Sequence, residues 1–143
     1  MNKEIVETIQ NFINLHHITK SRLIKPTKVE MDTINHAQMF IMLTLEEKGI
    51  QTMSNICEHT GISNQQMTKL IDDLVKPSLI SRNINATNRR ENLIELTPLG
   101  KDFLQLKKQE LVECSICRFE KFSDKEISVL NKDIKEILSI INK

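Results

Sequence analysis

The chain has 143 residues, which is the length of one domain and too short for two independent cores. Hydrophobic residues make up 39% and charged residues 27%, and this ordinary globular composition excludes wholesale disorder. The formal net charge is +1, so no overall field marks the protein as a partner of anions or cations. The apolar runs are short and the first residues lack the pattern of a signal segment, so we expect a cytoplasmic chain with no membrane contact.

Side-chain usage favours helices. Three Gly and three Pro allow few tight turns, and five Phe with no Tyr or Trp imply an aliphatic core. Apolar spacing predicts a helix over residues 3–24, a connector over 26–34 and a second helix over 36–48. Asn35 is its expected N-cap and Gly49 ends it. We expect its buried side to carry Met39, Phe40 and Leu43.

Two further short helices follow, over residues 52–59 and 64–75, with Ser63 as the expected cap of the second. The apolar residues at helical spacing are Met53, Ile56 and Cys57 in the first, and Met67, Leu70, Ile71 and Leu74 in the second. The second helix has a polar outer side formed by Asn64, Gln65, Gln66, Thr68, Lys69 and Asp72. This pair of helices predicts a helix-turn-helix.

After these helices, the spacing of apolar residues changes from the helical pattern to that of a β-hairpin. Residues 79–84 and 93–96 are predicted strands on either side of a polar tip at 85–90. Between residues 76 and 90 the chain has four cations and no acid: Lys76, Arg82, Arg89 and Arg90. Such a local basic segment is compatible with contact to a polyanion.

Two long helices are predicted at the C-terminal end. Thr97 and Pro98 begin the first, which runs to about residue 121, and Ser123 with Glu126 forms a capping box for the second. Apolar residues repeat in the last helix at intervals of 3 and 4, as in a coiled-coil seam: Ile127, Leu130, Ile134, Ile137 and Ile141. The fold class is therefore mainly α with a small β-hairpin wing, a winged helix-turn-helix flanked by terminal helices.

A winged helix-turn-helix has a physical basis for contacting double-stranded DNA. Its second helix can reach base edges in the major groove, and its hairpin tip can supply arginine to phosphates or to the minor groove. Asn and Gln suit adenine because each offers a donor and an acceptor. The predicted DNA-binding residues are Ser63, Asn64, Gln65, Gln66, Thr68, Lys69, Arg82, Asn88, Arg89 and Arg90. For Arg82, a phosphate contact and an ion pair within the fold are both open.

The stretch from Asn35 to Gly100 resembles the MarR family of winged-helix transcription regulators. Its most specific part is the wing, where Arg82, then Asn88-Arg89-Arg90, then Leu96-Thr97-Pro98-Leu99-Gly100 are similar to the family's "DRR…LTxxG" signature. The resemblance implies a single MarR-like domain over 1–143, with a DNA-binding lobe at 35–97 and helical dimerisation regions at 1–34 and 98–143. It also implies a homodimer on an inverted-repeat operator.

Two positions depart from the family's pattern. Asn88 stands where the wing usually has an acid, so the geometry and affinity of the wing are in question. Ser78, preceded by Pro77, stands where a glycine usually follows the second helix. This second departure could alter how the wing is set against that helix.

The three cysteines do not suggest a disulfide framework. Cys57 is expected to pack as a small hydrophobe between the two short helices. Cys114 and Cys117 share one face of a helix, and their spacing admits either core packing or a metal or redox site. His16 and His17, or the second copy of the chain, could complete such a site.

We therefore expect a DNA-binding transcriptional regulator, a homodimeric repressor released by an effector that is a small aromatic ligand or a redox or metal signal. No nucleophile elbow, phosphate loop or metalloprotease pattern is present, so we expect no enzyme, no catalytic residue, no metal and no cofactor. Two alternatives stay open: a winged-helix protein-interaction module without DNA binding, and a thiol or metal sensor acting through Cys114 and Cys117. A thiol enzyme using that pair is disfavoured because no strand precedes it.

Overall fold

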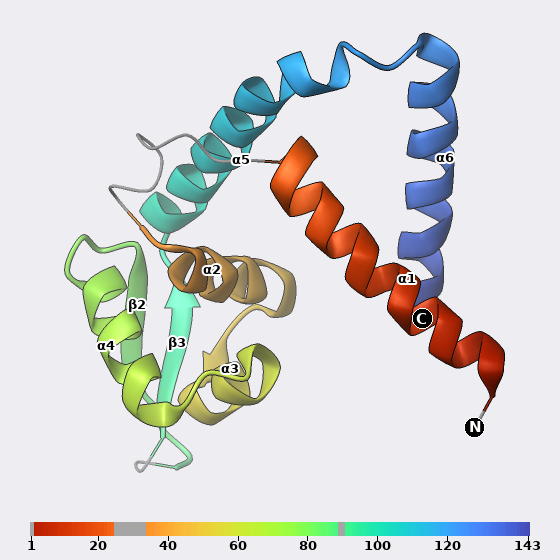
Figure 1. Ribbon diagram of the computed structural model, residues 1–143. Coiled ribbons are helices and arrows are strands. Elements are labelled where there is room, and N and C mark those ends of the chain that lie inside the picture. The colour runs from red at the N-terminus through yellow and green to blue at the C-terminus, as the bar shows by residue number, and fades with distance from the viewer. Residues whose placement is uncertain (1, 25–33, 89–90) are drawn as a thin grey trace. The chain divides into compact units, whose positions relative to one another are not determined.

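The computed structural model describes residues 2–24, 34–88 and 91–143 (Figure 1). It is mainly helical with a small antiparallel sheet, which confirms the predicted fold class. Its elements are α1 (Lys3–Ile18), η1 (Thr19–Leu23), α2 (His36–Lys48), β1 (Gln51–Thr52), α3 (Met53–Thr60), α4 (Asn64–Val75), β2 (Ile80–Ile84), β3 (Asn92–Leu96), α5 (Pro98–Phe119) and α6 (Asp124–Ile141). Among the described residues, no helix has the length and apolar character needed to span a membrane. The predicted connector at 26–34 lies almost entirely outside the described residues.

The chain forms two compact units, and the boundary between them falls inside α5. The first, here called the lobe, is Thr27–Glu110 and contains α2, the sheet, α3, α4 and the start of α5. The second, here called the helical unit, joins Met1–Pro26 to Leu111–Lys143. It contains α1, η1, the end of α5 and α6.

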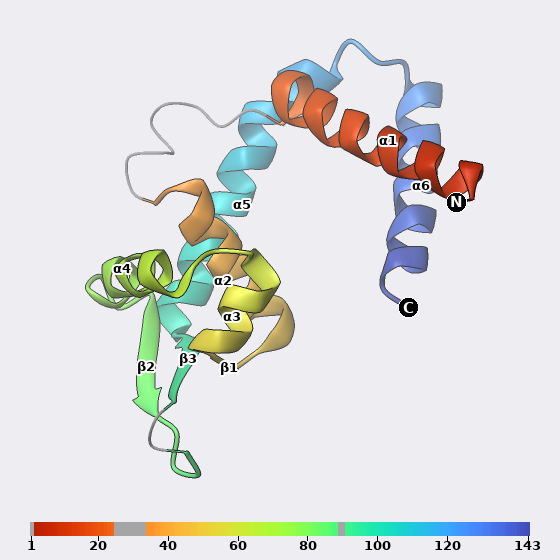
Figure 2. The same ribbon diagram turned by 60° about the horizontal axis from the view of Figure 1, so that its bottom comes forward.

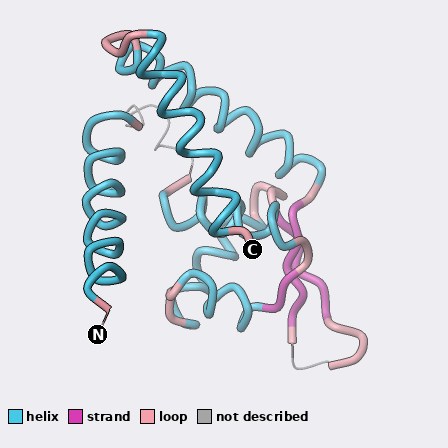
Figure 3. The backbone as a smooth tube through the Cα atoms, turned by 90° about the vertical axis from the view of Figure 1, so that its right-hand side faces the viewer, coloured by secondary structure: helices cyan, strands magenta, loops and turns pink. Residues whose placement is uncertain are grey.

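The sheet of the lobe has three antiparallel strands in the order β1-β3-β2. β2 and β3 pair from Ile80↔Leu96 to Ile84↔Asn92, and together they form the predicted hairpin. Figure 2 shows this hairpin extending away from the helices of the lobe, and Figure 3 shows the strands gathered at one side of it. β1 was not predicted because a strand of two residues is too short to show any alternation.

The core of the lobe is aliphatic, as the composition predicts. Its buried apolar residues are the following: Ile34, Ile41, Met42, Leu45, Ile56, Met67, Ile71, Leu74, Leu79, Ile80, Ile94, Leu96 and Leu104. The prediction for α2 was wrong at Phe40, whose side chain is 49% exposed, while Met39 and Leu43 only flank the core. Apolar residues occupy almost every position of this helix from Met39 to Leu45, so its spacing does not define one buried side.

Two of the predicted helix caps are complete capping boxes. In α2, the Gln38 backbone N–H donates to Asn35 Oδ1 at 2.9 Å, and the Asn35 N–H donates to Gln38 Oε1 at 2.8 Å. In α6, Ser123 and Glu126 exchange the same pair of bonds. The backbone N–H and the hydroxyl of Ser123 both donate to the Glu126 carboxylate and lower its pKa.

The helical unit leaves a large apolar surface exposed. The predicted helix over 3–24 is present as α1 and a π-helical turn, η1, and no residue of α1 or α6 is buried. In α1 the exposed apolar side chains are Ile5, Ile9, Phe12, Ile13, Leu15 and Ile18. In α6 they are Ile127, Val129, Leu130, Ile134, Leu138, Ile140 and Ile141. An isolated soluble chain rarely exposes so many large apolar residues on two helices.

Candidate nucleic-acid interface

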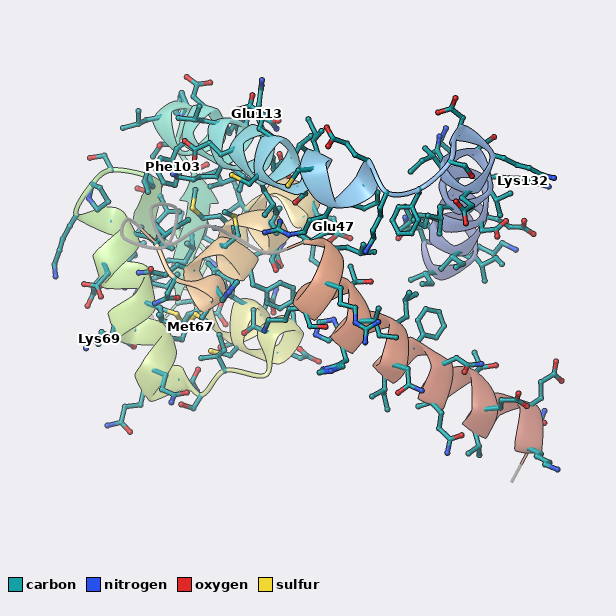
Figure 4. The ribbon with its side chains drawn as sticks, turned by 45° about the horizontal axis from the view of Figure 1, so that its top comes forward. Glu47, Met67, Lys69, Phe103, Glu113 and Lys132 are labelled. Atoms are coloured by element: carbon teal, nitrogen blue, oxygen red, sulfur yellow. The ribbon has the colours of Figure 1, made fainter. Side chains whose placement is uncertain are left out.

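α3 and α4 form the predicted helix-turn-helix. Thr52 caps α3 by accepting a hydrogen bond from the Asn55 N–H at 3.2 Å, and Gly61 ends the helix with a left-handed φ of +68°. α4 buries Met67, Ile71 and Leu74 and leaves its polar side exposed. Figure 4 shows Lys69 on the outer side of α4 and Met67 on the side that faces the rest of the lobe.

Six of the predicted DNA-binding residues lie on the exposed side of α4 or in the turn before it: Ser63, Asn64, Gln65, Gln66, Thr68 and Lys69. Several of these make hydrogen bonds with one another. The Thr68 hydroxyl donates to the Asn64 carbonyl oxygen at 3.0 Å, and the Ser63 hydroxyl donates to Gln66 Oε1 at 3.3 Å. Ser63 is the N-cap residue by position, but its side chain makes no capping bond to the backbone, so that part of the prediction was wrong.

Cys57 lies beside the first residue of α4. Its Sγ–H donates to Asn64 Oδ1 at 3.0 Å. The side chain is half-buried and packs against the lobe core, as expected for a small hydrophobe between α3 and α4. Burial raises the pKa of the Cys57 thiol, so the proton that makes this bond stays on sulfur at neutral pH.

The two carboxylates near the C-terminal end of α4 are paired with cations. Asp73 pairs with Lys76 at 3.0 Å, and Asp72 pairs with Arg82 Nη2 on β2 at 2.8 Å. The Arg82 side chain is only 28% exposed, and its Nε is buried without a hydrogen-bond acceptor among the described residues. Of the two open readings of Arg82, this placement favours the ion pair within the fold.

The wing tip is closed by polar side chains and backbone bonds. The Asn85 N–H donates to the Glu91 carbonyl at 3.0 Å, and the Glu91 N–H donates to the Asn88 carbonyl at 2.9 Å. The Thr87 N–H and hydroxyl both donate to Asn85 Oδ1. Asn88 is exposed next to this closure, and the predicted contacts Arg89 and Arg90 lie outside the described residues.

Ser78 adopts the backbone conformation that a glycine would adopt. Its φ is +60°, the one positive φ recorded for a non-glycine residue in the described part of the chain. The Ser78 N–H donates to the Val75 carbonyl and the Leu79 N–H to the Leu74 carbonyl, the paired bonds of a Schellman motif. Leu74 and Leu79 are both buried, which supplies the apolar contact typical of that motif. The serine therefore preserves the turn between α4 and β2.

The Thr97-Pro98-Leu99-Gly100 segment joins α5 to this turn. The Thr97 hydroxyl donates to the Ser78 carbonyl at 2.6 Å and accepts from the Gly100 N–H at 2.9 Å. A Cβ on Gly100 would lie 1.9 Å from the Leu79 carbonyl oxygen, so only glycine permits this approach. Sequence reasoning recognised this segment as a signature but missed its mechanical role, because Ser78 and Leu79 are about 20 positions away.

The remaining cysteines lie in the helical unit. Cys114 is half-buried and Cys117 exposed, and neither forms a disulfide bond. No group of three or more His, Cys, Asp or Glu side chains suited to a metal ion occurs within residues 2–24, 34–88 and 91–143. The described residues therefore offer no further ligands beside this cysteine pair.

An apolar cavity of about 650 Å³ also lies in the helical unit. It is lined by Ile24, Leu111, Val112, Ser115, Ile116, Phe119, Glu120, Phe122, Asp124 and Ile127. No methionine is among these residues.

The arrangement of α2 to β3 defines a winged helix-turn-helix protein. Residues 34–92 match the model of the MarR family. The fold is similar to that of apo wild-type MarR from E. coli, at 19% identity over 90% of this chain and 95% of that one, with a TM-score of 0.74. It is also similar to a MarR family protein from Bacillus stearothermophilus, at 18% identity over 100% and 99% of the two chains, with a TM-score of 0.68.

A third similar structure is a mutant of S. aureus MepR bound to an oligodeoxyribonucleotide, at 19% identity over 94% of this chain and 97% of that one, with a TM-score of 0.61. No curated protein matches the sequence significantly. The family match and the shared fold agree with the signature on the wing. Residues 34–92 thus match the MarR family, and the chain has the winged-helix fold of solved MarR-family structures.

Proposed function

We propose that the protein is a transcriptional regulator that binds double-stranded DNA through the outer side of α4 and the tip of the β2–β3 hairpin. The observation that carries this proposal is the exposed polar side of α4 beside the hairpin, in a chain whose residues 34–92 match the MarR family. The similar MepR structure contains bound DNA, which supports the same class of partner for this chain.

The proposed mechanism needs no chemistry on the DNA. Lys69 on α4 and Arg89 and Arg90 at the wing tip would neutralise phosphates, which supplies affinity that depends on salt. Amide side chains at the start of α4 would contact base edges and set the sequence preference. The ion pairs of Asp72 and Asp73 reduce the repulsion that free carboxylates on α4 would exert on phosphates.

The DNA-binding form is proposed to be a homodimer. The apolar side chains exposed on α1 and α6 support this assembly, because a second copy could cover them. Two lobes would then read an inverted repeat whose half-sites lie about one helical turn apart, roughly 34 Å. We further propose that the protein is a repressor and that an effector releases it by changing the separation of the two lobes.

Selection from a random library of duplex DNA tests the proposal most directly. We expect the purified protein to recover an inverted repeat with half-sites about one turn apart. Folded protein that recovers no sequence at low salt would contradict DNA binding and favour a protein-interaction module. If the recovered DNA is released only on oxidation or metal addition, and a Cys114→Ser, Cys117→Ser double variant is not released, the effector signal is a thiol one.

A further inference from the structure

The hydrogen bonds at the start of α4 distinguish its amide side chains from one another. Asn64 Oδ1 accepts from the Cys57 thiol at 3.0 Å, and Gln66 Oε1 accepts from the Ser63 hydroxyl at 3.3 Å. None of the described residues accepts a hydrogen bond from Asn64 Nδ2 or Gln66 Nε2. Both residues are exposed, so their NH₂ groups remain available to a ligand.

Packing holds Cys57, the donor of the hydrogen bond to Asn64, in place. Cys57 belongs to α3 and packs on the lobe core, where its helix also buries Ile56. In a planar amide the oxygen and the nitrogen are bonded to the same carbon and point in different directions. An oxygen engaged by the thiol therefore directs the NH₂ group of Asn64 away from α3.

We infer that Cys57 and Ser63 are positioning residues, which make Asn64 and Gln66 hydrogen-bond donors and so select guanine over adenine in the operator. This inference rests on the proposed function and specifies its base preference. Guanine presents two acceptors, N7 and O6, in the major groove, whereas adenine presents one acceptor and one donor. Recognition of adenine by Asn or Gln needs the amide oxygen as well as the nitrogen to face the base, and here the hydrogen bonds hold the oxygens toward Cys57 and Ser63.

Gln65 provides an internal contrast. It is exposed between the other two amides, and no side-chain hydrogen bond is recorded for it among the described residues. Both its oxygen and its nitrogen are available, so it keeps the pairing that suits adenine. The base pair read by Gln65 should not respond to changes at Cys57 or Ser63.

The test uses the full chain and the operator recovered by library selection. Loss of preference in Asn64→Ala identifies the base pair that Asn64 reads, and all four base pairs are then placed there. We expect the wild type to prefer guanine over adenine by about tenfold. Cys57→Ala should reduce this preference to within about twofold, and Cys57→Ser, which keeps a donor, should retain it. Ser63→Ala should act in the same way at the base pair read by Gln66.

The controls separate positioning from stability. A general loss of folding in Cys57→Ala would lower affinity for all four sites equally and would not be rescued by serine at the same position. A wild-type preference for adenine, or an unchanged guanine preference in Cys57→Ala, overturns the inference and leaves DNA binding intact. Absence of any DNA binding by the wild type would instead reject the proposed function.

Discussion

Gly100 lies where α5 passes closest to the turn after α4. A Cβ at this position would be 1.9 Å from the backbone oxygen of Leu79 and 2.9 Å from its carbonyl carbon, so the helix or the turn would have to move. We expect Gly100→Ala to lower the free energy of unfolding by at least ~2 kcal/mol, although alanine is the better helix former. Urea denaturation of the purified variant measures this change.

A second glycine supplies the control. Gly61 has a left-handed φ of +68° and open space around the place of a Cβ. Gly61→Ala should therefore cost only the conformational strain, about 1 kcal/mol. If Gly100→Ala is as stable as the wild type, the close approach of α5 to Leu79 is not present in solution.

Ser78 has the conformation of a helix-ending glycine with a side chain attached. Its left-handed φ of +60° is unfavourable for any residue with a Cβ, and its Schellman hydrogen bonds involve only the backbone. We expect Ser78→Gly to raise the free energy of unfolding by about 0.5–1 kcal/mol, since strain relief exceeds the entropic cost of glycine. Thermal melting checks the sign, with Ser78→Val as a matched variant that should melt lower than the wild type. A lower melting temperature for Ser78→Gly would contradict this account.

Single residues show where sequence reasoning succeeds and where it stops. Caps such as Asn35 and Ser123 were predictable because each cap and its partner lie within four positions. The engagement of Asn64 by Cys57 and of Asp72 by Arg82 was not predictable, because those contacts depend on how α3, α4 and β2 pack. The candidate site residues could thus be proposed from the sequence, but the hydrogen bonds and ion pairs that hold their side chains could not.

In the proposed complex, the wing formed by the β2–β3 hairpin contributes affinity that does not depend on the DNA sequence. Arg90 lies in the sequence between β2 and β3 and, in the proposed complex, contacts phosphate. Arg90→Ala should weaken binding by a similar factor on every DNA sequence and reduce the slope of log affinity against log salt by about 0.9 for each phosphate that the variant no longer neutralises. Binding isotherms at four salt concentrations, on the selected operator and on unrelated DNA, measure both effects.

A variant on α4 provides the contrast for the wing. Gln65→Ala should change the preference among base pairs and leave the salt slope near that of the wild type. The two variants together separate phosphate contacts from base reading. Identical isotherms for Arg90→Ala and the wild type would remove the wing tip from the proposed interface.

The buried side of a helix was predictable where its apolar residues follow a single helical spacing. α4 keeps a single apolar side, and the structure buries Met67, Ile71 and Leu74 as that spacing indicates. α2 is apolar on most of its surface, so its buried side depends on neighbours that the sequence does not identify, and Phe40 was misplaced for that reason. β1 exists because Gln51 and Thr52 pair with β3, more than 40 positions away along the chain.

At the scale of the whole molecule, the exposed apolar side chains of the terminal helices bear on how the protein assembles. The predicted seam of α6 consists of Ile127, Leu130, Ile134, Ile137 and Ile141. Ile137 is half-buried, and the other four residues are between 36% and 60% exposed in the single chain. Burial of one such side chain stabilises an assembly by about 1.5–3 kcal/mol, so a seam covered by a second copy would provide much of the dimer's stability. The seam's spacing was evident in the sequence, but spacing alone does not identify what covers it.

Ile134→Glu tests the assembly because it places a carboxylate at the middle of the seam. We expect it to sediment as a monomer at concentrations where the wild type is a dimer, since an unpaired charge in an apolar interface is strongly unfavourable. The monomer should also bind the inverted repeat far more weakly, because the two half-sites would no longer be bound by one linked pair of lobes. Ser128→Glu adds the same charge on the side of α6 away from the seam and should leave both properties unchanged. A dimeric Ile134→Glu variant would exclude the seam from the interface, whereas a monomeric variant that keeps full affinity for the inverted repeat would show that each lobe binds DNA independently.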